Sequence, residues 1–164
     1  MKDALHVGLL VPINNTTMEQ ELLAWLPPGS TCATQRIPRG KGLLTNETLP
    51  EYVAKALSLA RAFADPGVDV VAYGCTAAGF IAGPAGDAAL ASNIAGITGK
   101  NVVTTAHSMV AALQEIGAKR IALVTPYLDA VNTRLKAFLA HGGIAVKRFN
   151  SFYVQNTDAL GRIE

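Results

Sequence analysis

The 164-residue sequence has few charges, few aromatic residues and only two cysteines. Cys32 and Cys75 are too few for a disulfide framework or a cysteine-rich zinc site. The formal net charge is only +2, so neither nucleic acid nor an anionic membrane is an expected partner. No apolar run approaches the roughly 18–20 residues that span a bilayer. The N-terminus leads directly into an apolar segment without a signal-peptide cleavage pattern. These absences predict a cytoplasmic protein with reduced thiols.

Half of the residues are hydrophobic, and they fall into short apolar runs that alternate with segments of helical periodicity. The runs predict strands over 5–11, 31–37, 68–73, 101–105, 120–125 and 144–149. The intervening segments predict helices over 18–26, 48–64, 106–116 and 127–140, with further helices beginning near 76 and 156. Strict alternation of strand and helix predicts an α/β fold, with parallel sheets and helices on both faces.

One stretch combines a buried strand with a reactive side chain: Val68-Asp-Val-Val-Ala-Tyr-Gly-Cys-Thr-Ala-Ala-Gly-Phe80. Cys75 follows the strand and precedes a helix start, where backbone N–H groups and the helix dipole favour a thiolate. A catalytic nucleophile or base is one interpretation. The alternative is a small buried core thiol, because free cysteine is often buried and inert. Cys32, inside a predicted strand, is interpreted as a core residue.

The loop over 38–46 is basic and contains glycine. It follows a strand, where α/β folds place ligand-contacting loops. Arg39 and Lys41 are therefore candidates to attract a carboxylate, and the alternative is that they are solvated charges on a mobile loop.

The segments Val7-Gly-Leu-Leu-Val-Pro12 and Ile121-Ala-Leu-Val-Thr-Pro126 are similar, and each precedes a polar turn, a helix and another strand. This internal echo predicts two related lobes, over 1–98 and 99–164, with a ligand between them. If the second half had a counterpart of Cys75 as far beyond Pro126 as Cys75 lies beyond Pro12, that counterpart would fall after the last residue. We therefore expect the second lobe to be incomplete, or truncated.

Three motifs together carry a resemblance over essentially the whole chain: Pro12-Ile-Asn-Asn-Thr-Thr-Met-Glu19, Gly74-Cys-Thr-Ala-Ala-Gly-Phe80 and Thr125-Pro-Tyr-Leu-Asp-Ala-Val-Asn132. The chain resembles the aspartate/glutamate racemase superfamily, in particular its maleate cis–trans isomerase and arylmalonate decarboxylase branch. The resemblance implies two flavodoxin-like lobes related by a pseudo-twofold axis, with the site in the cleft and neither a metal nor an organic cofactor.

The resemblance also implies the chemistry. Racemases of this superfamily use two facing cysteines, one per lobe, to remove and return a proton. In the maleate isomerase branch the first-lobe cysteine adds to the alkene, and rotation followed by elimination gives fumarate. Arylmalonate decarboxylases carry glycine at this first position, so Cys75 disfavours that activity. The second cysteine of the family has no counterpart here, and Cys32 cannot replace it.

Carried over to this sequence, Cys75 is the catalytic residue. Asn15, Thr16, Thr76, Tyr127 and Asn156 are the substrate-binding candidates, and Asn14, Asn132 and Arg39 are further possibilities. Neutral amide and hydroxyl donors suit a dicarboxylate, because they bind it without pairing with the thiolate. Each has a structural alternative: Asn15, Thr16 and Asn156 as helix caps, Tyr127 as a packing aromatic and Asn132 as a helix residue that contacts a loop.

The sequence thus predicts a cofactor-independent isomerase of the maleate-to-fumarate type that acts on a small dicarboxylate through Cys75. One alternative is a non-catalytic or truncated relative that binds a small acid or only self-associates. Another is an aspartate or glutamate racemase. A nucleotide-binding flavodoxin-like domain is disfavoured, because the turn over 12–17 has no glycine to cradle a phosphate. An incomplete lobe exposes apolar surface and a sheet edge, so a homodimer or higher homo-oligomer is expected.

Overall fold

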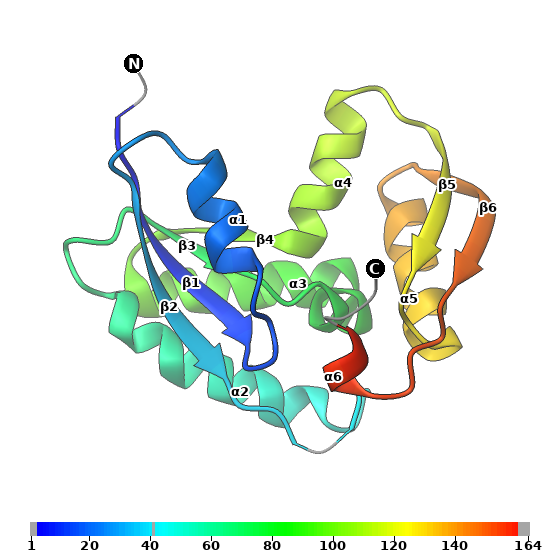
Figure 1. Ribbon diagram of the computed structural model, residues 1–164, viewed down its shortest axis with the longest axis horizontal. Coiled ribbons are helices and arrows are strands. Elements are labelled where there is room, and N and C mark those ends of the chain that lie inside the picture. The colour runs from blue at the N-terminus through cyan, green and yellow to red at the C-terminus, as the bar shows by residue number, and fades with distance from the viewer. Residues whose placement is uncertain (1–2, 41, 161–164) are drawn as a thin grey trace.

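The computed structural model describes residues 3–40 and 42–160, and it contains two parallel β-sheets with helices packed against them (Figure 1). The strands are β1 (His6–Pro12), β2 (Thr31–Ile37), β3 (Val70–Tyr73), β4 (Asn101–Thr104), β5 (Arg120–Thr125) and β6 (Ala145–Ser151). The helices are α1 (Met18–Trp25), α2 (Leu49–Ala60), the 3-10 turn η1 (Arg61–Phe63), α3 (Thr76–Thr98), α4 (Thr105–Glu115), α5 (Asp129–His141) and α6 (Thr157–Leu160). The predicted α/β class is confirmed. No helix within the described ranges is long and apolar enough to cross a membrane.

The first sheet has the strand order β2-β1-β3-β4, which is the flavodoxin-like order. Successive residues of β1 point to opposite faces, so Leu9 and Leu10 belong to different core clusters. The Leu9 cluster packs against α1 through Met18, and the Leu10 cluster packs against α2 and α3 through Ala56 and Ile94. Helices therefore cover both faces of this sheet, as predicted.

The fourth strand lies in the first sheet. β4 pairs with β3 in parallel, from Val70 opposite Asn101 to Tyr73 opposite Thr104. The division predicted at residue 98 assigns this strand to the second lobe, whereas its hydrogen bonds join it to the first sheet. Alternation of strand and helix cannot reveal this, because it does not say which sheet a strand enters. We retain two lobes as a proposal, with β4 in the first.

The second sheet consists of β5 and β6, which pair in parallel. Both β1–α1–β2 and β5–α5–β6 are thus parallel βαβ units, as the internal echo suggested. The core cluster beside this sheet combines residues of α5, such as Phe138, with Phe80 of α3. The Phe80 and Phe138 rings meet edge to face with centroids 5.6 Å apart. α3 therefore joins the two halves of the molecule.

α1, α4 and α5 lie within two residues of their predicted bounds, whereas the other helices differ more or had only a predicted start. α3 is interrupted at Gly83, whose φ of 73° and ψ of 173° are non-helical, and Pro84 begins its longer second arm. Proline suits a helix start because its missing N–H needs no partner there. α2 ends at Ala60 and continues only as the short turn η1. The predicted final helix is described only over Thr157–Leu160, and the rest lies outside the described residues.

Candidate active site

A cavity of about 230 Å³ lies where several strands end. Its walls come from the turn after β1, from Arg39 after β2, from the segment after β3 and from the turn after β5. The described lining residues are Pro12, Asn14, Asn15, Thr16, Thr17, Arg39, Gly74, Cys75, Thr76, Ala77, Pro126, Tyr127 and Leu160. Ligands of open α/β sheets bind outside the carboxyl ends of the strands, and this cavity occupies that position for both sheets.

Cys75 is the residue directly before α3, and only 4% of its surface is exposed. Gly74 precedes Cys75 at a position where a side chain would be crowded. A Cβ there would lie 2.4 Å from Met18 Sδ and 2.8 Å from Val11 Cγ1, so one of these side chains would have to move. The absence of a side chain at Gly74 lets the turn pass close beneath α1 and β1. The thiol is thereby held at the cavity wall by a tightly packed turn.

Burial raises the pKa of the Cys75 thiol above its ordinary value. The Tyr52 hydroxyl, the Ala78 backbone N–H, the Arg39 charge and the Tyr73 hydroxyl each lower this pKa, but the loss of hydration outweighs them. The helix start lowers the pKa of Cys75 through the Ala78 N–H, as the sequence suggests, but burial acts in the opposite direction and is the larger effect. The reason is that desolvation of a charge in a buried position costs more than a short helix arm and its hydroxyl neighbours supply.

Tyr52 and Tyr73 were missed by the sequence analysis. Both side chains are buried, and their hydroxyls interact with the Cys75 side chain. Burial is the main cause that raises the pKa of each tyrosine, and the nearby Cys75 raises it further. Tyr73 is adjacent in sequence to Gly74, which was a usable signal. Tyr52 lies 23 positions before Cys75 on the apolar face of α2, where it resembles an ordinary core aromatic.

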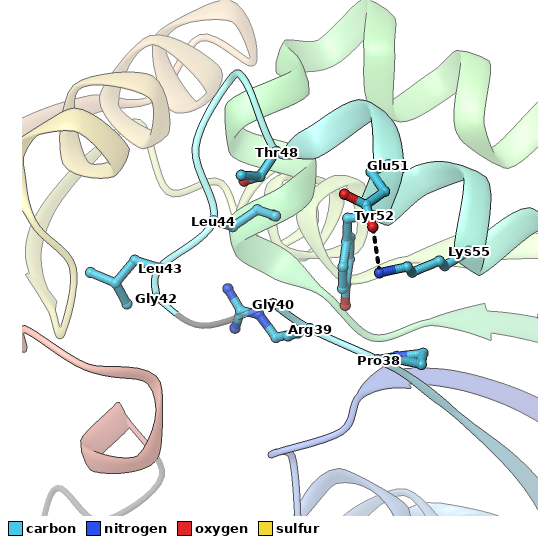
Figure 2. Close-up of a pocket in the computed structure, with 10 residues that line it drawn as sticks. All are labelled: Pro38, Arg39, Gly40, Gly42, Leu43, Leu44, Thr48, Glu51, Tyr52 and Lys55. Carbon is cyan, nitrogen blue, oxygen red and sulfur yellow. Dashed lines mark ion pairs between the residues drawn. The ribbon is translucent and has the colours of Figure 1, made fainter.

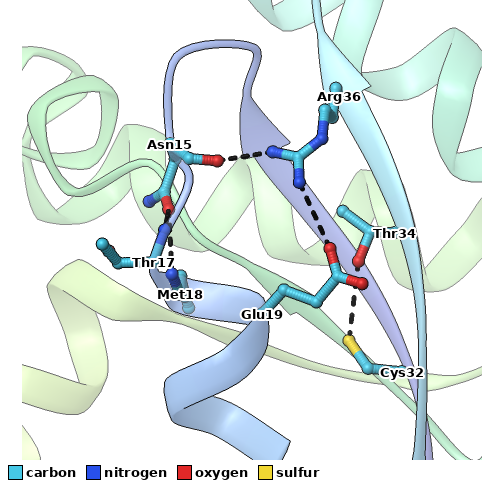
Figure 3. A network of polar contacts seen from close by, with 7 residues as sticks. All are labelled: Asn15, Thr17, Met18, Glu19, Cys32, Thr34 and Arg36. Carbon is cyan, nitrogen blue, oxygen red and sulfur yellow. Dashed lines mark hydrogen bonds and ion pairs between the residues drawn. The ribbon is translucent and has the colours of Figure 1, made fainter. Parts of the chain in front are cut away.

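Asn15 lines the cavity and also organises the turn that leads into α1 (Figure 3). Its Oδ1 accepts hydrogen bonds from the backbone N–H groups of Thr17 and Met18, at 3.2 and 3.0 Å. Arg36 of β2 donates to the Asn15 carbonyl and forms an ion pair of 3.3 Å with Glu19. The residue before α1 is Thr17, so neither Asn15 nor Thr16 is its N-cap as one interpretation had it; Asn15 instead binds the N–H of Met18, the first helical residue, from the preceding turn, and it lies at the cavity wall. Asn14 and Thr16 line the same cavity.

Thr76 is the first residue of α3 and lines the cavity beside Cys75. Its hydroxyl donates to the Thr105 hydroxyl over 3.1 Å, at the first turn of α4. This bond joins the two helix starts and leaves the Thr76 oxygen as a weak acceptor, with its proton directed to Thr105. The position of Thr76 in the cavity wall favours a role toward a substrate carboxylate. Its hydroxyl, however, would first have to turn away from Thr105 to donate to that carboxylate.

Tyr127 brings an aromatic hydroxyl to the cavity from the turn after β5. Its ring meets Phe80 edge to face, with centroids 6.3 Å apart. Burial, followed by the neighbouring Cys75, raises the pKa of Tyr127 to about 12, and Arg39 opposes this rise. The hydroxyl thus remains a proton-bearing donor throughout the neutral range.

Asn132 is buried and does not line the cavity. Its Nδ2 donates to the Tyr127 carbonyl over 2.7 Å, and its Oδ1 accepts from the Thr125 hydroxyl over 2.6 Å. The Ser151 hydroxyl reaches the same Tyr127 carbonyl over 2.6 Å. Asn132 thus holds the backbone of the turn that carries Tyr127, in line with its interpretation as a helix residue that contacts a loop.

Asn156 is exposed and stands before α6, where its Oδ1 accepts from the Ala159 backbone N–H over 2.8 Å. It is therefore a helix cap in this structure and is absent from the described cavity lining, whereas Leu160 of α6 is part of it. A ligand role for Asn156 remains a sequence-based prediction.

Arg39 is half-buried and lines both the Cys75 cavity and a smaller cavity of about 70 Å³ beside the loop after β2 (Figure 2). Its guanidinium carbon lies 5.9 Å from the centroid of the Tyr52 ring, which is a cation–π contact. Figure 2 also shows Glu51 and Lys55 of α2, which form an ion pair of 2.7 Å at the rim. Lys41, the other basic candidate on this loop, lies outside the described residues.

The described residues bring together no group of three or more histidine, cysteine, aspartate or glutamate side chains that could hold a metal ion. Residues 7–164 match the family model described as Amdase, arylmalonate decarboxylase. The chain belongs to the arylmalonate decarboxylase family. This family assignment agrees with the fold and with the three strand-end motifs that form the cavity.

Individual relatives include both sequences and solved structures. The chain is 27% identical to a maleate isomerase from Geobacillus stearothermophilus, an alignment that covers 99% of this chain and 69% of the relative. The maleate isomerase Iso from Pseudomonas putida S16 superimposes with a TM-score of 0.88 at 25% identity, over 99% of this chain and 69% of that one. A Cys-to-Ser mutant of the maleate cis–trans isomerase from Nocardia farcinica, with a covalently bound succinylcysteine intermediate, gives 0.84 at 25% identity over the same shares.

Proposed function

We propose that this protein is a cofactor-independent isomerase that converts a small cis dicarboxylate of the maleate type into its trans isomer through Cys75. The observation that carries the proposal is the position of Cys75: a thiol at the wall of a cavity that also presents Arg39, Asn15 and Tyr127. A cation and neutral donors around a nucleophile suit a dianionic substrate. The succinylcysteine in the Nocardia farcinica relative supports covalent chemistry at a cysteine.

The proposed reaction begins after the Cys75 thiol has released its proton to solvent water. The Sγ thiolate adds to one alkene carbon, and the π electron pair moves onto the carboxylate attached to the other carbon. The former double bond is now single and can rotate. The electron pair then returns, the C–S bond breaks and the trans alkene leaves with the thiolate regenerated. Donors beside that carboxylate stabilise the intermediate more than the substrate, which is the condition for catalysis.

Burial of Cys75 has a direct consequence for this reaction. Because burial raises its pKa, the thiol form of Cys75 is favoured over the thiolate at neutral pH. Once formed, however, a poorly hydrated thiolate is a strong nucleophile. We expect the observed rate to increase with pH through the raised pKa of Cys75, and a bell-shaped profile with an optimum below neutral pH would contradict this assignment.

The decisive test is to follow maleate and fumarate by NMR with the wild-type protein and with Cys75→Ala. We expect fumarate to form with the wild type and not with Cys75→Ala, and intact-mass spectrometry of the wild type to detect a succinyl adduct. Cys32→Ala is the matched control and should keep the activity. Fumarate formation at the wild-type rate by Cys75→Ala would refute the proposal.

Racemisation is the second catalytic candidate, since the superfamily assignment suggested by the motifs includes aspartate and glutamate racemases. It requires two thiols on opposite sides of the substrate. Cys32 lies on β2, packs with the core cluster that faces α1, and contacts the Thr34 hydroxyl at 3.7 Å. Cys75 belongs to the cluster on the opposite face of the sheet. One subunit therefore has no facing thiol within its described residues, and this favours isomerisation.

The non-catalytic alternative predicts dicarboxylate binding without turnover. Calorimetric titration with maleate and with succinate separates this outcome from catalysis, because binding without fumarate formation would support it. We also propose a cytoplasmic location, because a nucleophilic Cys75 requires a reducing compartment and both cysteines are free thiols.

A further inference from the structure

Cys75, Tyr52 and Tyr73 belong to one buried cluster, although they come from different parts of the chain. Tyr52 is on α2, Tyr73 ends β3, and the exposed fractions of the two tyrosines are 4% and 1%. Within the described part of the chain, neither hydroxyl makes a hydrogen bond of acceptable distance and angle to any partner. The group near both hydroxyls is the side chain of Cys75.

A buried hydroxyl without a partner destabilises a fold, and phenylalanine would fill the same space without this cost. Two such hydroxyls around one thiol therefore suggest a partner that is present only in another state of the site. A thiolate is that partner: its sulfur accepts hydrogen bonds, whereas the neutral thiol is a weak acceptor.

We propose that Tyr52 and Tyr73 are positioning residues that donate hydrogen bonds to the Cys75 thiolate and fix the direction of its Sγ toward the cavity. The proposal rests on the proposed function only in treating Cys75 as the nucleophile. Two donors on a thiolate also leave fewer lone-pair directions available, so the sulfur attacks along the remaining one, toward the cavity.

The charged and titratable groups that act on this cluster come from each neighbouring element. They are Arg39 after β2, Tyr52 on α2, Tyr73 on β3, Asp87 on α3 and Tyr127 after β5. Among these groups Arg39 carries the positive charge, and its guanidinium lies over the Tyr52 ring. Tyr52 thus contacts both the cation of the loop and the thiol, so it links the anion-attracting residue to the nucleophile.

The two tyrosines are tested by measuring the second-order rate of Cys75 alkylation by iodoacetamide as a function of pH, in a Cys32→Ala background. Tyr52→Phe and Tyr73→Phe should each move the profile to higher pH and lower the rate at pH 8 by about tenfold, which corresponds to a pKa increase of one unit. Tyr52→Phe should have the larger effect, because the Tyr52 hydroxyl lowers the pKa of Cys75 more than Tyr73 does. The double variant should exceed either single one.

Tyr153→Phe is the matched control, since this tyrosine is 44% exposed and lies outside the cluster. Its profile should equal that of the background. Loss of packing alone would expose Cys75 and speed alkylation at every pH, which is the opposite of the expected change. Unchanged or uniformly faster profiles in both tyrosine variants would overturn the proposal.

Alkylation does not require turnover, so this test separates the two proposals. A shifted profile in a protein that forms no fumarate would keep the tyrosine assignment and refute the isomerase. Fumarate formation with unchanged profiles would keep the isomerase and refute the tyrosine assignment.

Discussion

Cys75 and its neighbours illustrate which single residues can be identified from a sequence. Asn15, Cys75 and Tyr127 each follow a strand end, and parallel strands bring such positions to one edge of a sheet, so their assembly into one cavity could be predicted. Tyr52 could not, because its spacing on α2 fits a core residue equally well. The pKa direction of Cys75 could not be predicted either, because it depends on how completely the tertiary fold removes water.

Asp87 is a buried carboxylic acid outside the Cys75 cavity lining, and it offers a prediction at the residue scale. It is 2% exposed on α3, and its Oδ2 accepts from the Thr104 hydroxyl over 2.5 Å. Burial raises the pKa of this carboxyl, although the Thr104 hydrogen bond and His107 oppose the rise. The folded state therefore binds the proton more tightly than the unfolded state. This contribution to stability is fully present at low pH and is lost as pH rises through the raised pKa.

Asp87→Asn should remove this dependence, because an asparagine oxygen still accepts from Thr104 but does not titrate. We expect the free energy of unfolding of the wild type, relative to that of Asp87→Asn, to decrease between about pH 4 and neutral pH. Urea unfolding at intervals of pH measures this difference. Asp3→Asn, at an exposed position, is the control and should run parallel to the wild type. Parallel curves for Asp87→Asn would show that the Asp87 carboxyl is not perturbed.

At the scale of elements, the strands were easier to predict than the helices. β2 and β5 each end next to a proline, at Pro38 and Pro126, and both strands have the predicted bounds. The interruption of α3 at Gly83 was not predicted, since glycine and alanine occur throughout that segment and give little periodicity. The membership of β4 depends on its pairing with β3, which is a long-range property.

The turn between β3 and α3 gives a prediction at this scale. Gly74→Ala places a methyl group against Met18 and Val11, and the stiff β-branched Val11 cannot move aside as Met18 can. We expect a loss of about 1–3 kcal/mol in the free energy of unfolding, measured by urea denaturation. The Met18→Ala change should restore only part of it, since Val11 remains.

Gly96→Ala on α3 is the matched control for this change. No atom lies within 4 Å of a Cβ placed there, and the position is exposed in a helix. Alanine should stabilise the protein by up to about 1 kcal/mol, because it has a higher helix propensity than glycine. If both glycine variants were equally stable, the close approach at Gly74 would not constrain the turn.

At the scale of the whole molecule, the second sheet exposes apolar side chains. Val124 on β5 is 62% exposed and Phe152 after β6 is 59% exposed. Ile116, at the end of α4, is 76% exposed. The chain also spans 69% of the length of the maleate isomerases that it matches. Exposed apolar residues beside a two-stranded sheet favour association with another copy.

We therefore predict a homodimer or higher homo-oligomer at micromolar concentration, to be measured by sedimentation velocity. Val124→Lys should weaken the association, because a lysine on this face would have to be desolvated in an interface. Gln20→Lys, on exposed α1, is the control and should leave the sedimentation unchanged. A wild-type monomer across this concentration range would contradict the prediction.

The hydrogen bonds that Asn15 makes within the turn before α1 have a consequence for which molecules the cavity accepts. With its Oδ1 committed to the Thr17 and Met18 N–H groups, the Asn15 amide can offer a ligand only its NH₂ group. Arg39 is likewise a donor, and no aspartate or glutamate belongs to the described lining. An amino acid therefore finds donors for its carboxylate but no counter-charge for its ammonium group. We therefore expect the cavity to discriminate by the sign of charge, so that succinate competes with maleate far better than aspartate does.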